Sequence, residues 1–350
     1  MSRDLQRKII FSMVFALLFY MAMAIWSDWR ELTQALTAFP WQWLPLVISL
    51  TLVNYVGRLL KWQWYLRLLG VKIDGRDSAR IFGIGMLMVM TPGKAGEFLK
   101  SYMVKNVAGT PMSVTAPAVL AERMTDAMAM LLLAAAGLFA FPDPTARGVA
   151  ILVLCTFLTT TVIIQVRPLA MRVLEIGKHL PVIRRFADHL YSFYESSYII
   201  FNPRNLAIAL TIGLVSWVAE GLAYYVVLLG VGVVPGPQII LVAVFIFCIS
   251  TVIGALFATP GGLGGVEGSL VALSVRLLGL AGASAAAAAL LVRFCTLWLG
   301  VSIGVVSFFL WPSFLAGSEL ARQAEAPMAN SGANPGADPG ADPVADIVGN

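Results

Sequence analysis

Two short stretches that both begin Thr-Pro-Gly contain the residues best suited to bind a ligand. The first spans residues 91–97, Thr-Pro-Gly-Lys-Ala-Gly-Glu, and the second spans residues 259–267, Thr-Pro-Gly-Gly-Leu-Gly-Gly-Val-Glu. Each follows an uncharged apolar run. We expect helices to start inside the membrane at Thr91-Pro92 and at Thr259-Pro260. Such helix starts direct unpaired backbone N–H groups inward and attract anions, above all phosphates. Two ordinary Pro-Gly turns between helices are the alternative interpretation.

The spacing of charged residues indicates that the two stretches are related. Arg123 and Arg293 lie 170 positions apart, and so do Glu97 and Glu267. Both arginines fall within apolar runs, where a charge is costly and usually functional. We therefore interpret the chain as two repeats, each with one broken helix and one buried arginine.

These residues predict a polar cavity for a phosphate-bearing head group, closed alternately from each side of the membrane. Glycines let a head group come close to the backbone. Lys94 and the two arginines supply positive charge, and the two glutamates pair with the arginines when the site is empty. The predicted substrate-binding residues are Thr91, Pro92, Gly93, Lys94, Gly96, Glu97, Arg123, Thr259, Pro260, Gly261, Gly262, Gly264, Glu267 and Arg293.

Three further carboxylates lie in apolar runs and are assigned to coupling or to ion pairs. Glu122 and Asp126 share one helix face at i, i+4, and Arg123 reaches Asp126 at i+3. A structural ion-pair network and a proton-coupling role both stay open for this pair. Glu220, in the middle of another apolar run, is interpreted in the same way.

The composition assigns the chain to the polytopic helical membrane proteins. Of its 350 residues, 59% are hydrophobic and 12% are charged, whereas soluble domains carry about 25% charge. The mean hydropathy is +0.83, and the apolar runs are continuous rather than alternating, as helices require. The net charge of +5 fits membrane topology and contact with anionic lipid, not nucleic-acid binding.

We expect an all-α fold with about six transmembrane helices and two re-entrant helical hairpins. The expected transmembrane helices are Ile9–Trp26, Trp43–Tyr65, Thr115–Phe141, Val149–Val166, Leu206–Leu229 and Ala283–Trp311. The hairpins join Ile81–Met90 to Glu97–Val107 and Ile239–Ala258 to Leu270–Leu280. Residues 27–42 are expected to be a short connecting segment. Arg58, Lys61 and Arg67 are expected to extend their charged ends to the inner interface.

Domain boundaries follow from the same pattern. Residues 1–146 form the first membrane repeat, and residues 147–312 form the second, which includes an amphipathic cytoplasmic loop at 167–203. Residues 313–350, rich in Ala, Gly, Pro and Asp, are expected to be a disordered tail.

The loops set the expected orientation. Three crossings per repeat is an odd number, so the second repeat lies inverted relative to the first. The loops after the second and fourth expected helices are basic, and those after the third and fifth are nearly uncharged. The positive-inside rule then places both termini in the cytoplasm of a bacterial inner-membrane protein. This inverted-repeat plan is typical of secondary transporters, whose broken helices meet near the midplane.

Signatures of enzymes and metal sites are missing from the sequence. Gly93-Lys94 lacks the other residues of a nucleotide-binding phosphate loop, and neither HExxH nor GxSxG occurs. Cys155, Cys248 and Cys295 lie in apolar runs without metal-ligand spacing. We therefore expect a protein that is not an enzyme and that uses no metal or cofactor.

Three motifs together resemble a known family. Residues 91–97, residues 122–126 (Glu-Arg-Met-Thr-Asp) and residues 260–267 look like the flippase-like membrane region of lysylphosphatidylglycerol synthases, including its small members without a soluble synthase domain. The resemblance covers roughly residues 5–312. It implies translocation of a lipid between leaflets and argues against aminoacyl transfer.

Two functional hypotheses follow. The first is a flippase for a phospholipid or a lipid-linked glycan, which would be its partner in the membrane. The second is a non-transporting membrane subunit that anchors or regulates a lipid- or glycan-modifying enzyme, with residues 167–203 and the tail as docking surfaces. A homo-oligomer is compatible with either hypothesis.

The expected topology can be tested with single cysteines in a background without the native ones. Asp143→Cys and Val234→Cys should react with a membrane-impermeant thiol reagent added from outside, because both lie in expected external turns. Leu180→Cys should react only after the membrane is opened. Labelling of position 180 from outside would end the inverted-repeat interpretation.

Overall fold

The computed structural model describes residues 29–91, 96–138, 187–257 and 259–315, together with residues 148, 151 and 155. These residues form helices joined by short turns, and no strand occurs among them. Several expectations lie outside the described residues: the helices at Ile9–Trp26 and Val149–Val166, the turn at 142–145, most of the loop at 167–203, and the tail from residue 316.

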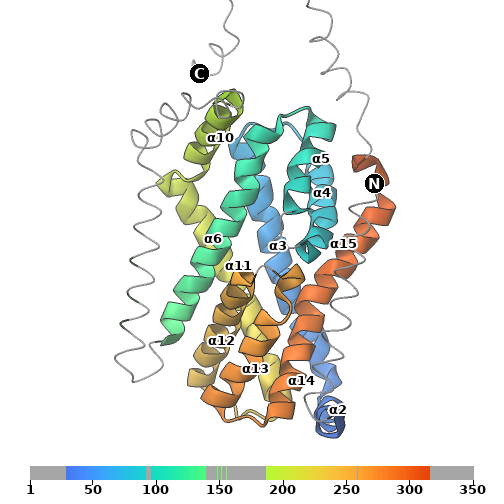
Figure 1. The fold of residues 1–350 in the computed structure, drawn as a ribbon, viewed down its shortest axis with the longest axis vertical. Coiled ribbons are helices and arrows are strands. Elements are labelled where there is room, and N and C mark those ends of the chain that lie inside the picture. Colours follow the sequence, from blue (N-terminus) through green and yellow to red (C-terminus); the bar gives the residue numbers. More distant parts are fainter. Residues whose placement is uncertain are drawn as a thin grey trace, which may run out of the picture.

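Most of the expected helices are present with small shifts at their ends. The described helices are α2 (Trp29–Ala38), α3 (Leu44–Leu68), α4 (Gly75–Leu87), α5 (Leu99–Ala108), α6 (Met112–Leu138), α10 (Ala187–Ile200), α11 (Pro203–Gly230), α12 (Pro237–Leu256), α13 (Gly265–Leu278), α14 (Gly282–Arg293) and α15 (Leu299–Leu310). Figure 1 shows the long helices running roughly along one common axis.

An all-α membrane protein is confirmed, since five helices of the described part are long and apolar enough to cross a bilayer. They span Trp41–Leu68, Pro203–Gly230, Pro237–Leu256, Pro260–Leu278 and Gly282–Leu310. By length and composition, therefore, α12 qualifies as a crossing helix, and so does α13 when the turn at Pro260–Gly262 is counted with it, although the sequence predicted two arms of a hairpin there. The helix α6 is not among the five, because Glu122, Arg123 and Asp126 lie in its middle.

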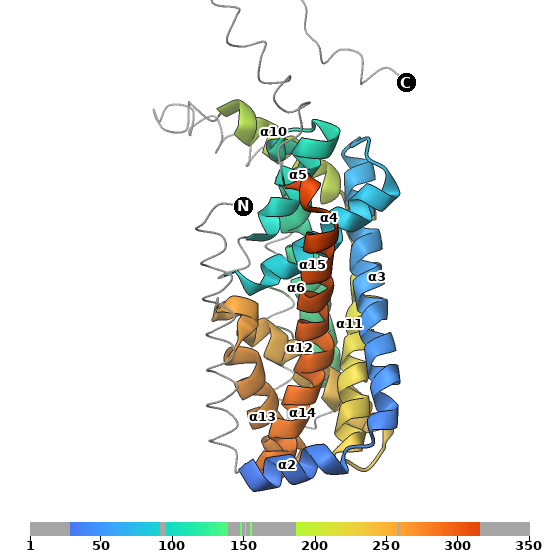
Figure 2. The same cartoon turned by 90° about the vertical axis from the view of Figure 1, so that its right-hand side faces the viewer.

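The expectation of a plain connecting segment at 27–42 is wrong. Residues Trp29–Ala38 form α2, which lies across the lower end of the bundle in Figure 2. Leu32 is buried against Ala286 and Ala287 of α14. The helix forms because one apolar face packs on small side chains while the other face stays polar, as in helices that lie along a membrane surface.

Two broken helical pairs approach each other from opposite ends of the bundle. In Figure 1, α4 and α5 occupy the upper half, and α12 and α13 occupy the lower half. The turn at Met88–Met90 contacts the turn at Pro260–Gly262, and apolar side chains from both pairs and from α15 fill the contact: Leu87, Met88, Met90, Leu263 and Val301, with Leu297. We call these turns, with the adjoining helix ends, the first break (residues 87–91 and 96–98) and the second break (residues 257 and 259–267).

Each break packs against a glycine of a neighbouring helix. A Cβ on Gly304 of α15 would lie 2.4 Å from the backbone nitrogen of Leu87. A Cβ on Gly254 of α12 would lie 2.2 Å from Cγ2 of Val266 and 3.1 Å from its backbone nitrogen. Real Cβ atoms do not come within 2.4 Å of a backbone atom or within 2.2 Å of another carbon, so both breaks are packed where a side chain is missing.

The helix that follows Arg293 changes its winding. Residues Phe294–Trp298 form a π-helical turn between α14 and α15, and such turns are rare and frequently mark functional sites. The hydroxyl of Tyr55 on α3 donates to the carbonyl of Thr296 within this turn. The single helix expected at 283–311 therefore consists of two α-helical segments in different registers.

A single added methyl group tests the packing of the first break. Gly304→Ala should lower the free energy of unfolding by about 1–3 kcal/mol, the usual cost of overpacking, because α15 and α4 must separate. Gly268→Ala is the matched control, since a Cβ there meets nothing within 4 Å and alanine favours a helix. The midpoints of thermal unfolding in detergent should fall for the first variant and hold or rise for the second. Equal midpoints would contradict the packing argument.

Candidate functional site

Thr91 ties the two sides of the first break together. Its hydroxyl donates to the carbonyl of Met88 at 2.6 Å and accepts from the backbone N–H of Gly96 at 2.8 Å. A Cβ on Gly96 would lie 2.6 Å from Cγ2 of Thr91. Pro92, Gly93 and Lys94 lie outside the described residues, so the structure does not place that part of the predicted site.

An ion-pair network holds the first break to α3 and α6. Glu122 is fully buried and accepts hydrogen bonds from Lys100 at 2.5 Å, from Arg123 at 2.6 Å and from Arg58 at 3.1 Å. Asp126 pairs with Lys61, with Arg123 at 3.2 Å and with Arg58 at 3.7 Å. Each acid therefore has three basic partners.

Glu97 of the first break joins the same network. Its Oε2 lies 3.2 Å from Nε of Arg123, and its side chain is buried. The sequence analysis placed Arg123 within reach of this glutamate, and the contact is confirmed. The pair joins the second arm of the break to the middle of α6.

The expectation that Arg58 and Lys61 extend to the membrane interface is wrong. Lys61 is completely buried and pairs with Asp126, and Arg58 pairs with Glu122. Buried acids on α6 give both cations closer partners than the interface does, and a buried charge is stable only when it is paired. Arg67 is exposed, in agreement with the prediction.

Lys100 was missed as a network residue by the sequence analysis. Its side chain passes over Gly85 of α4, where a Cβ would lie 2.7 Å from Cγ of Lys100. Its ammonium group lies 4.7 Å from the centre of the Trp62 ring, a favourable position for a cation. The available signal was its position three residues after Glu97, which places both on one helical face.

Arg293 clamps the second break. Its Nε donates to Glu267 at 2.7 Å, and its Nη2 donates to the carbonyl of Gly261 at 2.6 Å. The other oxygen of Glu267 accepts from the backbone N–H of Gly264 at 2.8 Å. The expected pairing of Arg293 with Glu267 is thus confirmed, and the pair also fixes the backbone of the turn.

The helix expected to start at Thr259–Pro260 starts instead at Gly265. Gly261, Gly262 and Gly264 have positive φ angles of 63°, 70° and 87°, which interrupt an α-helix. Thr259 donates through its hydroxyl to the carbonyl of Leu263. Because the N–H of Gly264 already donates to Glu267, this helix start has fewer free N–H groups for binding an anion than the sequence implied.

Two adjoining cavities lie between the breaks. The first is about 100 Å³ and is lined from both breaks by Val89, Gly261 and Gly262, together with Arg58, Arg123, Arg293 and Glu220. The second is about 290 Å³ and is lined by Glu97, Arg123, Asp126, Thr259 and Gly262 among others. Arg123 and Trp217 line both.

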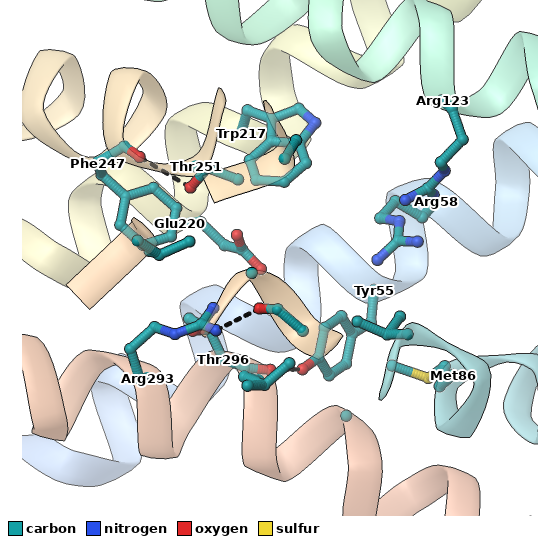
Figure 3. A pocket seen from close by; sticks show the side chains of 17 residues that line it. Tyr55, Arg58, Met86, Arg123, Trp217, Glu220, Phe247, Thr251, Arg293 and Thr296 are labelled. Atoms are coloured by element: carbon teal, nitrogen blue, oxygen red, sulfur yellow. Dashed lines mark hydrogen bonds between the residues drawn. The ribbon is translucent and has the colours of Figure 1, made fainter. Parts of the chain in front are cut away.

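Three arginines line the first cavity, whereas three of the acids that pair with them do not. Figure 3 shows Arg58 and Arg123 entering from one side and Arg293 from the opposite side, with Glu220 between them. Glu122, Asp126 and Glu267 do not line this cavity. Its wall therefore presents three guanidinium groups and one carboxylate, an arrangement that favours an anion.

The charges around the two breaks balance within the described residues. The basic side chains are Arg58, Lys61, Lys100, Arg123 and Arg293, and the acidic ones are Glu97, Glu122, Asp126, Glu220 and Glu267. Because the numbers of positive and negative charges are equal, the cost of burying them is reduced. The wall of the first cavity is still positive, because three arginines and only one of the acids line it. No group of three His, Cys, Asp or Glu suited to a metal ion occurs in the described part of the chain.

Comparison with known proteins assigns most of this chain to one family. Residues 10–304 match the family described as the lysylphosphatidylglycerol synthase TM region. A UPF0104 membrane protein of Methanothermobacter thermautotrophicus is 26% identical over 313 residues, which cover 83% of this chain and 90% of that protein. A second UPF0104 membrane protein of that organism is 23% identical over 274 residues, which cover 71% and 79% of the two chains.

The two arginines should differ in their effect on stability. Arg293→Gln should lower the free energy of unfolding by about 3 kcal/mol or more, since it removes a cation from a buried carboxylate. Arg293→Gln with Glu267→Gln should restore much of that loss. Arg123→Gln takes the arginine from buried Glu97 as well. It should still cost less, because Arg123 is 23% exposed against 9% for Arg293 and because Arg58, Lys61 and Lys100 still neutralise the acids of α6.

Denaturant titration of the purified protein in micelles measures all of these variants. Arg276→Gln is the matched control, because Arg276 is exposed near the end of α13. The clamp assignment fails if Arg293→Gln is no more destabilising than Arg276→Gln.

Proposed function

Because the chain belongs to the lysylphosphatidylglycerol synthase TM-region family, we propose that it moves a phosphate-bearing lipid between the leaflets of the membrane. The cargo is a phospholipid or a lipid-linked glycan. The observation that carries the proposal is the cavity between the two breaks, whose wall presents Arg58, Arg123 and Arg293. Guanidinium groups bind phosphate through paired hydrogen bonds, and such charges are rare at this depth in a membrane protein unless they serve a function.

The proposed architecture is an inverted repeat with six crossings and two re-entrant hairpins. Helices α4 and α5, with 13 and 10 residues, are about 20 Å and 15 Å long. Both are too short to cross a hydrocarbon core of roughly 30 Å. Their break meets the break of α12 and α13, which enter from the other end of the bundle. Transporters built this way bind substrate where the discontinuous helices meet.

The proposed orientation has the upper end of Figure 1 in the cytoplasm of a bacterium, with both termini on that side. In Figure 1 this end holds the last turn of α3, the first turns of α4 and α11 and the last turn of α5. Those helix ends and the turn between α3 and α4 contain most of the exposed or partly exposed basic residues of the described part: Arg67, Lys72, Arg76, Arg80, Lys105 and Arg204. Arg30 belongs to α2 and Arg276 to the last turn of α13, which lie at the opposite end. Cytoplasmic loops of membrane proteins carry such an excess of Lys and Arg.

In the proposed mechanism, the lipid phosphate takes the place of a carboxylate as partner of Arg123. This arginine is the most accessible of the three, with 23% of its side chain exposed against 13% for Arg58 and 9% for Arg293. The first cavity has room for several water molecules but not for a whole lipid head group. The breaks must therefore separate during passage, and their apolar contact through Met90, Leu263 and Leu297 lets them part without breaking an ion pair.

We propose that Glu122 and Asp126 serve in ion pairs rather than in proton coupling, and the three basic partners of each acid support this. Transport in this proposal requires no ATP hydrolysis and no enzymatic step by this chain. The lipid moves down its own gradient, or with an ion that the described residues do not identify.

The proposal predicts that the purified protein moves labelled phospholipid in liposomes on its own. Arg123→Gln should fold and yet lose most of the transport, and Arg123→Lys should recover part of it, because charge survives without the planar fork. A fluorescent phospholipid quenched from outside the liposome measures the transfer. Arg67→Gln, an exposed arginine away from the cavity, is the control for charge.

Two outcomes would go against the proposal. Wild-type liposomes that move no phospholipid or lipid-linked glycan would favour a non-transporting subunit that regulates a lipid- or glycan-modifying enzyme. Unchanged transport in Arg123→Gln would show that the cavity arginines do not contact the cargo.

A further inference from the structure

A lateral groove lies on the outside of the bundle between α3, α4 and α15. It has a volume of about 450 Å³, the largest among the cavities described above. Its walls are apolar, with Leu52, Val56 and Leu59 from α3, Phe82 from α4 and Ile303 from α15. Leu52 and Val56 are 42% and 54% exposed, so the groove opens to the surroundings of the protein. Gly83 and Ser307 also line the groove, and α4 and α15 pack closely there, since a Cβ on Gly83 would lie 2.6 Å from Oγ of Ser307.

The groove has the depth of one leaflet. It extends along α4 from Arg76 to Met86, a separation of ten residues or about 15 Å along a helix. That is half of the roughly 30 Å hydrocarbon core of a bilayer. An acyl chain that starts at the membrane surface and ends at the midplane matches this length.

Positive charge lies only at the outer end. Arg76 and Arg80 are the charged residues of the lining, and both lie in the first half of α4, while Trp311, which also lines the groove, follows the end of α15. The guanidinium of Arg80 lies 5.3 Å from the centre of the Trp311 ring. Asp77, which pairs with Arg80 at 2.8 Å, does not line the groove. Aromatic and basic side chains at this level are typical of contacts with lipid head groups.

At its inner end the groove meets the cavity between the breaks. Tyr55 and Met86 line both spaces and so form the partition between them. Tyr55 is held by its hydrogen bond to the carbonyl of Thr296, in the π-helical turn. The apolar groove and the cavity with the three arginines thus have these two side chains in common.

We propose that this groove is the site where one acyl chain of a phospholipid is held, with its phosphate on Arg76 and Arg80, before the head group passes the Tyr55–Met86 partition. The inference deepens the proposed function and rests on it. The ligand class is a glycerophospholipid from the leaflet on the side of Arg76 and Arg80. The matching length, the apolar walls and the positive outer end together select this occupant.

Photoaffinity labelling tests the site directly. The full-length protein is placed in nanodiscs with phosphatidylglycerol that carries a photoreactive diazirine in one acyl chain, and the adducts are mapped by mass spectrometry. We expect adducts concentrated on α3, α4 and α15 at groove residues. A diacylglycerol with the same photoreactive chain, which lacks the phosphate, should label these residues less.

Two pairs of variants distinguish lipid bound in the groove from lipid bound elsewhere on the protein surface. Val56→Trp should fill the groove and remove the concentrated labelling, whereas Val53→Trp should not, because Val53 is similarly exposed on α3 but does not line the groove. Arg76→Gln with Arg80→Gln should weaken labelling by about five-fold per arginine, the size expected for a basic residue at an anionic membrane surface. Arg67→Gln with Lys72→Gln makes the same charge change at exposed sites outside the groove and should have little effect.

Other occupants give distinct results. A photoreactive amino acid at position 56 should form an adduct with lipid, and a cross-link to a second copy of the chain would overturn the proposal. Adducts spread evenly over the lipid-facing surface would overturn it too. If the liposomes transport lipid while Val56→Trp behaves as the wild type, the groove assignment fails and the proposed function stands. If labelling concentrates in the groove but no lipid is moved, the proposed function fails instead.

Discussion

The structure depends on neutralising charge in a place where water cannot do so. A lone arginine or carboxylate inside a membrane protein is costly, and the described core gathers five basic and five acidic side chains around two interrupted helices. Each interruption is fastened by an arginine–glutamate pair to the long helix that follows it in the chain. Replacing both members of an arginine–glutamate pair by neutral residues would keep the core neutral but would remove the contact that holds the break to its helix. The position of both breaks therefore follows from electrostatics as much as from apolar packing.

Much of this arrangement was predictable because isolated buried charges must find partners. The two arginine–glutamate pairs, the breaks themselves and the long helices followed from spacing and hydropathy. The partners of Lys61 and Lys100 did not, because spacing along a helix defines a face and not the neighbour that the face meets. The start of α13 at Gly265 was missed because Thr-Pro is a strong start signal, whereas three glycines in left-handed conformation delay the helix. The short helix α2 was missed because its stability comes from packing on α14, which hydropathy does not report.

The two breaks are not equivalent, although their sequences are similar. In the first break, Glu97 shares one arginine with two other acids, and three more cations surround them. In the second, one arginine holds one glutamate and one backbone carbonyl. A network of several acids and cations can exchange a partner at low cost, whereas the second pair also holds the backbone of its own turn through Gly261 and Gly264. The first break is therefore better suited to admit a ligand anion, and the second to serve as a rigid reference against which the first moves.

The π-helical turn at Phe294–Trp298 has a consequence for how the last long helix works. Before the turn, the helix presents Arg293 to the second break, and after it the helix presents Gly304 to the first break. A π turn holds one residue more than an α turn, which shifts the angular phase of everything beyond it by about 100°. The π turn thus sets the orientation of the side chains of α14 and of α15 separately, so that each segment faces its own half of the molecule. Reverting the turn to α geometry would rotate α15 about its own axis while α14 stayed in place, turning Gly304 away from Leu87. A rotation of α14 about its axis, caused by movement at the second break, would therefore be transmitted through the π turn to α15 and would move the first break.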